Sequence, residues 1–430
     1  MKIVESHEEL SKLVDIVSDR ESHWFVMWVD SEKHPLNTHI SFISIQVQGE
    51  VHVVGLDHVD LICFDTDELS DLFATDSPKY IFQKKKVLHS LNLSGKLYDV
   101  DSYYYLDSME TIDYNSHFEH LTNRLYMMGV YDDHIKSIPI MKLSESVQEL
   151  FNKYSGVNPQ LEGYLWFNEK YIPTLTKLES RGLLVDKSKL VDKYSEKQLK
   201  HVDENQRVYT EYNPFTATGR PSNRHGGVNY AGLNKKDGTR EIFYSGDSVF
   251  VHFDFDGYHP RIIGELIDFE LPRTSAHEYL ADIYGVGYDE SKGITFKNLY
   301  GGIMDEYKDH PFFKQTDEFI NKHWEQVTED GYIKTLYREI LLSWVSDINP
   351  QKAFNYLLQA IETEKNIDKL DKIFDIIDET DIYLILYTYD SFLFEVPKNV
   401  DKLKLREIYN ILTSGGYPIT YSYGTTYQEL

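Results

Sequence analysis

Residues 248–256 read SVFVHFDFD, and residues 383–396 read YLILYTYDSFLFEV. In the first stretch, alternating apolar residues predict a strand that ends at Asp254. In the second, two apolar runs flank a short polar turn at Asp390, which is typical of a hairpin. One aspartate at a strand end or turn is ordinary turn chemistry. Two aspartates on adjacent strand ends of one sheet can instead share two divalent cations, a site suited to in-line displacement at phosphorus.

The segments around these two stretches predict a mixed fold. Helical patterns lie between the stretches, to about residue 365, and a helix over Asp401–Thr413 precedes a last strand over Ile419–Tyr423. Upstream, residues 171–186 predict a helix that stops at Gly182 and leads into a short strand. This order of strands and helices favours an α+β, palm-like unit over a doubly wound sheet.

Residues 288–302 read YDESKGITFKNLYGG. Lys292, Phe296 and Tyr300 recur every four residues, so a helix presents a cation and two aromatic rings on one face. Such a face can meet a triphosphate through the lysine and stack on a base through the rings. An ordinary amphipathic helix that ends at Gly301-Gly302 has the same pattern, and this alternative stays open.

The charge of the chain restricts its binding modes. With 44 Lys and Arg against 70 Asp and Glu, the net charge is -26, which argues against a general nucleic-acid coat protein. Residues 180–240 are a basic island in this acidic chain, and residues 187–206 predict one charged helix within it. The Gly- and Asn-rich stretch from Tyr209 to Arg240 predicts a long functional loop. A solvated helix face is the plain alternative for the basic island.

Further features of the sequence indicate the compartment. Cys63 is the single cysteine of 430 residues, which excludes a disulfide within the chain and favours a reducing cytoplasm. We expect Cys63 to be a buried core residue. No apolar run reaches the length of a membrane span, and the charged N-terminus is unlike a signal peptide.

The N-terminal third predicts a separate domain. Residues 24–60 alternate in the manner of strands, and helical patterns follow around 66–75 and 116–130. Residues 137–160 are polar and mixed, so we interpret them as a junction. The predicted domains are therefore 1–150 and 151–430.

Together these segments resemble the family A DNA polymerases, the bacterial DNA polymerase I class, and its phage members in particular. The resemblance covers about residues 160–430, in the order and near the spacing of the family. Its segments are YIPTLTKLESRGLLVD (171–186), the TGR motif and its following loop (212–243), FDFDGYHPRIIGEL (253–266, motif A), Lys292 to Tyr300 (motif B), NYLLQ (355–359) and TYDSFLFEV (388–396, motif C).

The resemblance implies a right-hand polymerase fold with palm and fingers, the fingers at 262–348. It implies an RNase H-like α/β exonuclease-like domain before the palm. The implied activity is template-directed DNA synthesis on primer-template DNA from dNTPs, with two Mg²⁺ ions held by Asp254 and Asp390. The other implied contacts are Lys292, Phe296, Tyr300, His259 and His277 for the nucleotide, and Arg220, Asn229, Arg261, Asn355 and Gln359 for DNA.

The chain departs from the family pattern in several places. His259 stands where motif A usually carries a glutamate that helps to exclude ribonucleotides, and Tyr288 stands where motif B opens with an arginine. In motif C, Tyr389 and Ser391 flank Asp390 in place of the usual histidine and glutamate. The thumb is short, because only the stretch 187–206 fits it. We therefore expect grip on DNA to depend on a processivity or replisome partner, or on short substrates.

The N-terminal domain carries one candidate nuclease site. Asp30 and Glu32 follow a predicted strand and point to the same face, where they could bind a metal. The segment that should supply the next aspartate reads QKKKVLHSL (83–91), so we expect an exonuclease-like fold without activity. Two alternatives to a polymerase stay open: a catalytically impaired DNA-binding or scaffold relative, and a 3′-5′ exonuclease that acts through Asp30 and Glu32.

Overall fold

The computed structural model describes residues 1–30, 33–127, 134–193, 201–223 and 228–430. The chain packs as two units, Met1–Thr176 and Lys177–Leu430. The predicted domain boundary between residues 150 and 151 falls inside a helix whose Leu150 and Phe151 are buried in the core of the first unit. No helix in the described part of the chain is both long and apolar enough to cross a bilayer.

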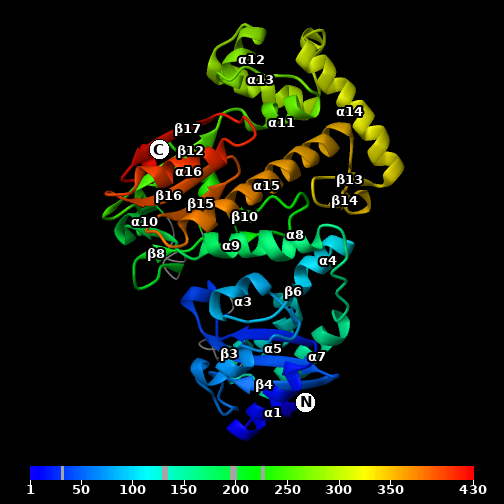
Figure 1. Ribbon diagram of the computed structural model, residues 1–430, viewed down its shortest axis with the longest axis vertical. Coiled ribbons are helices and arrows are strands. Elements are labelled where there is room, and N and C mark those ends of the chain that lie inside the picture. Colours follow the sequence, from blue (N-terminus) through cyan, green and yellow to red (C-terminus); the bar gives the residue numbers. More distant parts are fainter. Residues whose placement is uncertain (31–32, 128–133, 194–200, 224–227) are drawn as a thin grey trace. The chain divides into compact units, whose positions relative to one another are not determined.

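A six-stranded sheet forms the centre of the first unit, with the strand order β1-β4-β3-β2-β5-β6 (Figure 1). Its strands are β1 (Lys2–Ile3), β2 (Ser22–Trp28), β3 (Ile40–Val47), β4 (Glu50–Gly55), β5 (Lys79–Ile81) and β6 (Leu97–Asp99). The hairpin β3–β4 and the pair β2–β3 are antiparallel, whereas β1, β5 and β6 pair in parallel with their neighbours. The strands predicted within residues 24–60 are confirmed.

Both faces of this sheet are covered, because side chains along a strand alternate between its two faces. Trp24, Val26 and Trp28 of β2 belong to one core, whereas Phe25 and Met27 belong to the other. The first core includes α1 and α2, and the second includes α5 and α7. The helices of this unit are α1 (His7–Ser18), α2 (Ser70–Phe73), α3 (Lys84–Ser90), α4 (Val100–Ser108), α5 (Tyr114–Met127), α6 (His134–Ser137), α7 (Ile140–Lys153), α8 (Tyr164–Trp166) and α9 (Ile172–Glu179), the last of which continues into the second unit.

Two predictions for the first unit are wrong. Residues 137–160, interpreted as a junction, contain the helix α7, because Leu143, Val147 and Leu150 recur at helical spacing and are buried against the sheet. Cys63, expected in the core, is exposed. Cys63 forms an isolated bridge with Gly55 at the end of β4, while its neighbour Phe64 enters the first core and Leu61 packs against the second.

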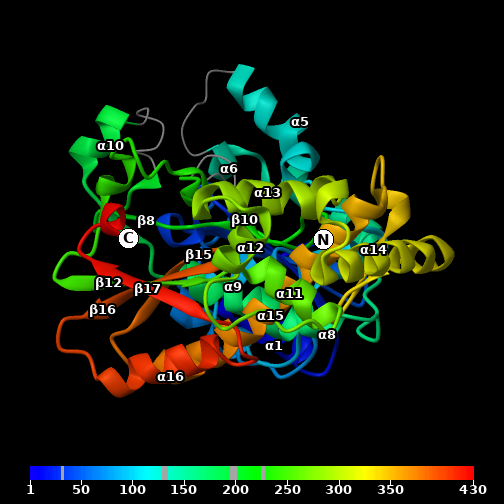
Figure 2. The ribbon, with the colours of Figure 1, turned by 90° about the horizontal axis from the view of Figure 1, so that it is seen from above.

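The second unit contains a four-stranded antiparallel sheet with the order β15-β16-β12-β17. These strands are β12 (Ser248–Phe255), β15 (Tyr383–Thr388), β16 (Ser391–Pro397) and β17 (Ile419–Gly424). They confirm the strand, the hairpin and the last strand predicted from the sequence. Figure 2 shows α16 (Lys402–Leu412) on one side of this sheet and α10 (Lys187–Lys193) and β8 (Arg207–Val208) on the other.

The remaining elements of this unit surround the sheet. The 28-residue helix α15 (Pro350–Ile377) packs against α11, α13, α14 and α16, so it connects most of the helical part (Figure 1). The other helices are α11 (Tyr258–Leu266), α12 (Ala276–Tyr284), α13 (Tyr288–Gly301) and α14 (Pro311–Asp330). The small strands are β7 (Leu183–Val185), β9 (Tyr212–Asn213), β10 (Ser222–Asn223), β11 (Phe243–Tyr244), β13 (Tyr332–Lys334) and β14 (Glu339–Leu341).

The helix predicted over residues 187–206 is shorter than expected. The described helix α10 ends at Lys193, and residues 194–200 lie outside the described residues. At the far end, the Asp203 side chain accepts the Arg207 N–H at 2.7 Å, and Gln206 adopts φ +61°. This aspartate-led turn ends the segment before β8, so the helix does not reach residue 206.

Candidate active site

The two predicted metal-binding aspartates lie on neighbouring strands of the four-stranded sheet. Asp254 is the penultimate residue of β12, and its register partner on β16 is Ser391. Asp390 directly precedes Ser391 in the β15–β16 turn, and its carbonyl oxygen accepts the Phe255 N–H at 3.0 Å. Backbone pairing therefore places both aspartates at one end of the sheet, where both line the same cavity.

The turn that carries Asp390 has an uncommon backbone conformation. Tyr389 has φ +64°, in the left-handed region that side-chain-bearing residues rarely adopt. Two contacts hold it there: Asn366 Nδ2 donates to the Tyr389 carbonyl at 2.8 Å, and the Arg220 guanidinium lies 3.6 Å from the centre of the Tyr389 ring. Residues in such conformations cluster at functional sites, where the surrounding structure fixes them.

Both carboxyl groups are harder to ionise than ordinary aspartates. Burial and the nearby charge of Asp390 raise the pKa of Asp254 to about 7. Burial and the charge of Glu362 raise the pKa of Asp390. A divalent cation offsets both effects, because it supplies the positive charge that buried carboxylates lack. Carboxylate oxygens are also the ligands that Mg²⁺ prefers, so these residues fit the predicted cofactor.

The cavity has a volume of about 520 Å³ and is enclosed by the end of β12, the β15–β16 turn, α11, α13 and α15. Its lining combines carboxylates, cations and aromatic rings. The predicted site residues that line it are Asp254, Asp390, Lys292, Phe296, Tyr300, His259, His277, Arg220, Asn355 and Gln359. The structure thus brings together segments that are far apart in the sequence.

The helix α13 presents the predicted face to this cavity. The rings of Phe296 and Tyr300 are stacked, with centroids 5.7 Å apart and planes inclined by 17°. Lys292 Nζ lies 4.4 Å from the centre of the Tyr288 ring at the start of the helix. Phe296 is 47% exposed, which leaves its ring accessible for stacking. Leu299 points the other way, into the core, so the helix separates a buried face from a cavity face.

His277, on α12, is the remaining phosphate candidate. Burial and the charge of Lys292 lower its pKa, so near neutral pH the imidazole is largely uncharged and acts as a hydrogen-bonding group. On α15, Gln359 Nε2 donates to Asn355 Oδ1 at 3.1 Å, and Thr218 Oγ1 donates to Gln359 Oε1 at 3.1 Å. The two amides are therefore oriented by each other and by the loop that carries Arg220.

Two predicted DNA-binding residues have partners within the protein. The Asn229 side chain accepts the Gly232 N–H at 3.3 Å and caps the short turn that follows it. Arg261 is buried and donates to the Asp256 carboxylate at 3.0 Å and to three backbone carbonyls. Of the described residues, those lining the cavity include neither Asn229 nor Arg261. Their DNA contacts stay predictions; within this chain Asn229 caps a short turn, and Arg261 holds the segments around Asp256 and Thr274.

Sequence reasoning missed Asp256, two residues after Asp254. Its carboxylate pairs with Arg261 and accepts the Ala276 N–H at 2.7 Å and the Ser275 hydroxyl at 3.0 Å, which fixes the start of α12. Gly257 follows with φ +58°, and a Cβ there would lie 2.7 Å from Ala276 Cβ. In the sequence, the only sign of this contact between Asp256 and the start of α12 is an acidic residue that precedes a glycine at the end of a strand.

Sequence reasoning also missed Glu362 of α15, which lines the cavity and is 1% exposed. Its Oε2 lies 3.1 Å from Arg220 Nε and 3.4 Å from His259 Nε2. Burial alone raises the pKa of this carboxyl group, but His259 and Arg220 outweigh burial and hold the pKa below its usual range. No pattern in the sequence identifies it, because a glutamate within a long helix is usually solvated.

The predicted nuclease residues are in a different environment. Asp30 pairs with Lys33 at 3.5 Å, and Glu32 lies outside the described residues. Lys86, from the lysine run, lies 4.5 Å over the ring of Trp28, near the same end of β2. Among the described residues, Asp30 belongs to no group of three or more acidic, histidine or cysteine side chains able to hold a metal.

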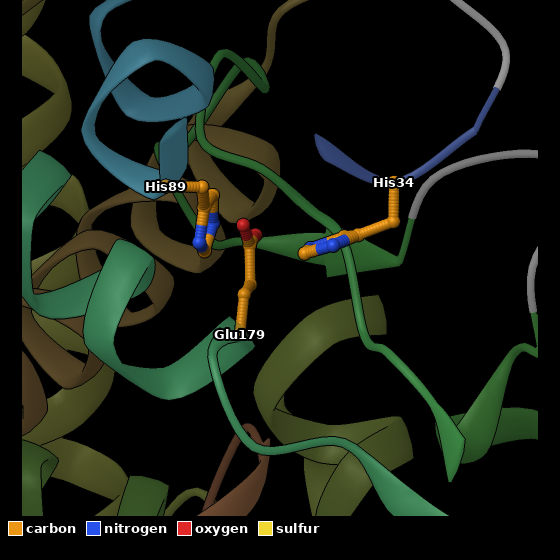
Figure 3. Close-up of side chains that lie close together, drawn as sticks. All are labelled: His34, His89 and Glu179. Carbon is orange, nitrogen blue, oxygen red and sulfur yellow. The ribbon is translucent and has the colours of Figure 1, made fainter. Parts of the chain in front are cut away.

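Two histidines lie elsewhere in the first unit. The rings of His34 and His89 meet edge to face, with centroids 4.9 Å apart (Figure 3). The third side chain drawn there, Glu179, belongs to the second unit, where it accepts the Tyr212 N–H at 2.6 Å. His34 Nδ1 accepts the Leu36 N–H at 3.3 Å and so caps a short turn.

Comparisons with known proteins establish the fold. No protein-family model and no curated protein matches this sequence. Among solved structures, the fold is similar to that of the POL domain of Pol1 from M. smegmatis, in complex with DNA primer-template and dNTP. The similarity covers 100% of both chains, with a TM-score of 0.72 and 14% sequence identity. The chain therefore has the fold of a DNA polymerase domain, as the sequence predicted.

Proposed function

We propose that this chain is a template-directed DNA polymerase that adds deoxynucleotides to the 3′ end of a primer. The observation that supports it most is the pair Asp254 and Asp390, which backbone pairing places side by side at the edge of one cavity. The similarity of the fold to a DNA polymerase domain also supports this function. The family A assignment, with a phage-type chain, is part of the same proposal.

In this proposal, Asp254 and Asp390 hold two Mg²⁺ ions, which when bound lower the pKa of the primer hydroxyl and neutralise charge on the triphosphate. Lys292 adds a positive charge on the wall of the cavity, where it can bind the phosphates. Phe296 and Tyr300 offer stacked rings for the incoming base.

The stretch 187–206 and the first unit have separate roles in the proposed polymerase. The stretch 187–206 is a reduced thumb, so the polymerase depends on a processivity partner or on short substrates. The first unit is an exonuclease-like domain without activity, since Lys86 stands near the end of β2 and Asp30 pairs with Lys33. The single cysteine of the chain, the free and exposed Cys63, fits a reducing, cytoplasmic compartment.

The test is extension of a labelled primer on a DNA template with dNTPs and Mg²⁺. We expect Asp254→Ala and Asp390→Ala to reduce the rate at least 10³-fold while DNA binding is kept, because each removes a metal ligand. The matched control is Asp247→Ala, an exposed aspartate just before the other end of β12. Extension by either active-site variant at the wild-type rate rejects the assignment. Degradation of single-stranded DNA that is lost in Asp30→Ala would instead support the nuclease alternative.

A further inference from the structure

A buried carboxylate connects three segments of the cavity wall. Glu362, on α15, is 1% exposed and contacts Arg220 at 3.1 Å and His259 at 3.4 Å. Arg220 comes from the loop before β10, and His259 from α11. Residues from three distant parts of the sequence therefore meet at one acidic side chain that lines the cavity.

Within the cluster of Glu362, Arg220 and His259, the histidine contacts α13. His259 Nδ1 is hydrogen-bonded to the Tyr300 hydroxyl, and Nε2 faces Glu362. The 3.4 Å between Nε2 and the Glu362 carboxylate is an ion-pair distance, and a carboxylate attracts an imidazole that carries its proton on the facing nitrogen. The imidazole is then fixed in one orientation, which leaves Nδ1 directed at Tyr300. Because Tyr300 stacks with Phe296, the orientation of His259 sets the position of the aromatic face.

The arginine of this cluster contacts the turn that carries Asp390. The Arg220 guanidinium lies 3.6 Å over the ring of Tyr389, whose backbone has φ +64°. An arginine paired with a buried carboxylate has little freedom to leave that ring. Glu362 thus fixes the side chain that covers this uncommon turn, next to the residue proposed to bind metal.

The arrangement of Arg220 and His259 depends on the negative charge of Glu362 between them. Two cationic or proton-donating groups, Arg220 and His259, share one carboxylate away from water. Removal of one member of a buried charged cluster leaves the others uncompensated, which is far more disruptive than the loss of a surface ion pair. Loss of the Glu362 charge therefore removes the ion-pair partner of Arg220 and of His259 at once.

We propose that Glu362 is a positioning residue for nucleotide binding: through His259 it orients Tyr300, and through Arg220 it fixes the Tyr389 turn beside Asp390. This inference rests on the proposed polymerase function for its kinetic test. It assigns a role to a residue of α15 that neither the sequence motifs nor the comparisons assign.

The test measures single-turnover addition of one dNTP to a primer by the full chain, as a function of dNTP concentration. We expect Glu362→Gln to raise the apparent dNTP dissociation constant at least tenfold, with a smaller change in the maximal rate. The matched control is Glu364→Gln, on the same helix and equally buried, whose partner is Arg338 at 3.5 Å. We expect it to leave the dissociation constant within threefold, even where it lowers the melting temperature.

A second measurement separates positioning from general damage to the fold. If Glu362 acts partly through the Tyr300 hydroxyl, the effects of Glu362→Gln and Tyr300→Phe are not independent. Independent effects would multiply in the apparent dNTP dissociation constant. We expect the dissociation constant of the double variant to be at least fivefold lower than that product. Purely multiplicative effects, or a dissociation constant unchanged in Glu362→Gln, overturn the inference. Should Glu362→Gln fail to fold, His259→Gln replaces it in the same cycle.

The failure of this inference and that of the proposed function are distinguishable. A wild-type chain that extends primers while Glu362→Gln matches it refutes only the positioning role. A wild-type chain that extends no primer refutes the polymerase function. In that case the coupling between Glu362→Gln and Tyr300→Phe is measured in urea unfolding instead, where additive effects refute the cluster and non-additive effects support it.

Discussion

Replacement of Asp254 by asparagine should stabilise the metal-free protein while it abolishes activity. The pKa of Asp254 is raised from 3.8 to about 7, first by burial and then by the charge of Asp390. At about 1.4 kcal/mol per pKa unit, ionisation in the folded protein is unfavourable by about 4 kcal/mol. Because the side chain is partly exposed, solvent screens the charge, and we expect about 2 kcal/mol of this to be measured.

The pH dependence of this gain has a definite sign. A carboxyl group with a raised folded-state pKa contributes stability that is fully present below its unfolded pKa, near 3.8, and is lost as the pH rises through about 7. Asparagine resembles the protonated form and loses nothing as the pH rises. The advantage of Asp254→Asn should therefore be smallest near pH 4 and largest at pH 8.

The assay is urea unfolding in EDTA at pH 5 and at pH 8, with each variant compared with the wild type at the same pH. Asp256→Asn is the matched control with the opposite expected sign, because it weakens the ion pair with Arg261 at 3.0 Å and the tether of α12. We expect it to destabilise the protein by about 1–3 kcal/mol. A neutral or destabilising effect of Asp254→Asn at pH 8 would refute the description of Asp254 as a buried, repelled carboxylate.

Three further predictions follow from other parts of the second unit. Mg²⁺ should bind about fivefold more tightly at pH 7 than at pH 6, because a proton on Asp254, whose pKa is about 7, competes with the metal. An affinity that calorimetry finds independent of pH contradicts this. Gly219→Ala should lower the free energy of unfolding by about 1–3 kcal/mol, because Gly219 has φ +66° and a Cβ there would lie 2.5 Å from Arg338 Nη2. An unchanged free energy of unfolding in urea would contradict this close approach. Lys369→Met should destabilise by about 2–4 kcal/mol, because Lys369 Nζ donates to carbonyls at the end of α16, and a neutral result in thermal unfolding would show that water replaces it.

The sequence predicts those strands and helices whose apolar residues, spaced as the element requires, are also the residues buried in the core. The strands β2, β12, β15 and β16 alternate or run apolar between polar turns, and each forms where that pattern places it. The helix α13 carries the lysine and the two aromatic rings on its cavity face for the same reason. These elements and the β15–β16 turn hold Asp254, Asp390, Lys292, Phe296 and Tyr300, so half of the predicted residues that line the cavity follow from local sequence.

Features that depend on distant partners could not be predicted in this way. Glu362 is charged and lies within a long helix, and only its contacts with Arg220 and His259 explain why it is buried. Arg261 follows the predicted motif, but the Asp256 carboxylate and backbone carbonyls engage its donors. In α7, polar residues on the exposed face hide the apolar stripe that packs against the sheet, so the composition misled the prediction.

The most direct test of the central claim is whether the template dictates the nucleotide that is added. Four primer-templates that differ only in the first unpaired template base are each incubated with one dNTP at a time and Mg²⁺. The account predicts that the wild-type chain adds only the complementary dNTP to each, and that Asp390→Ala adds none. Addition without regard to the template base, no addition by the wild type, or normal addition by Asp390→Ala would contradict it.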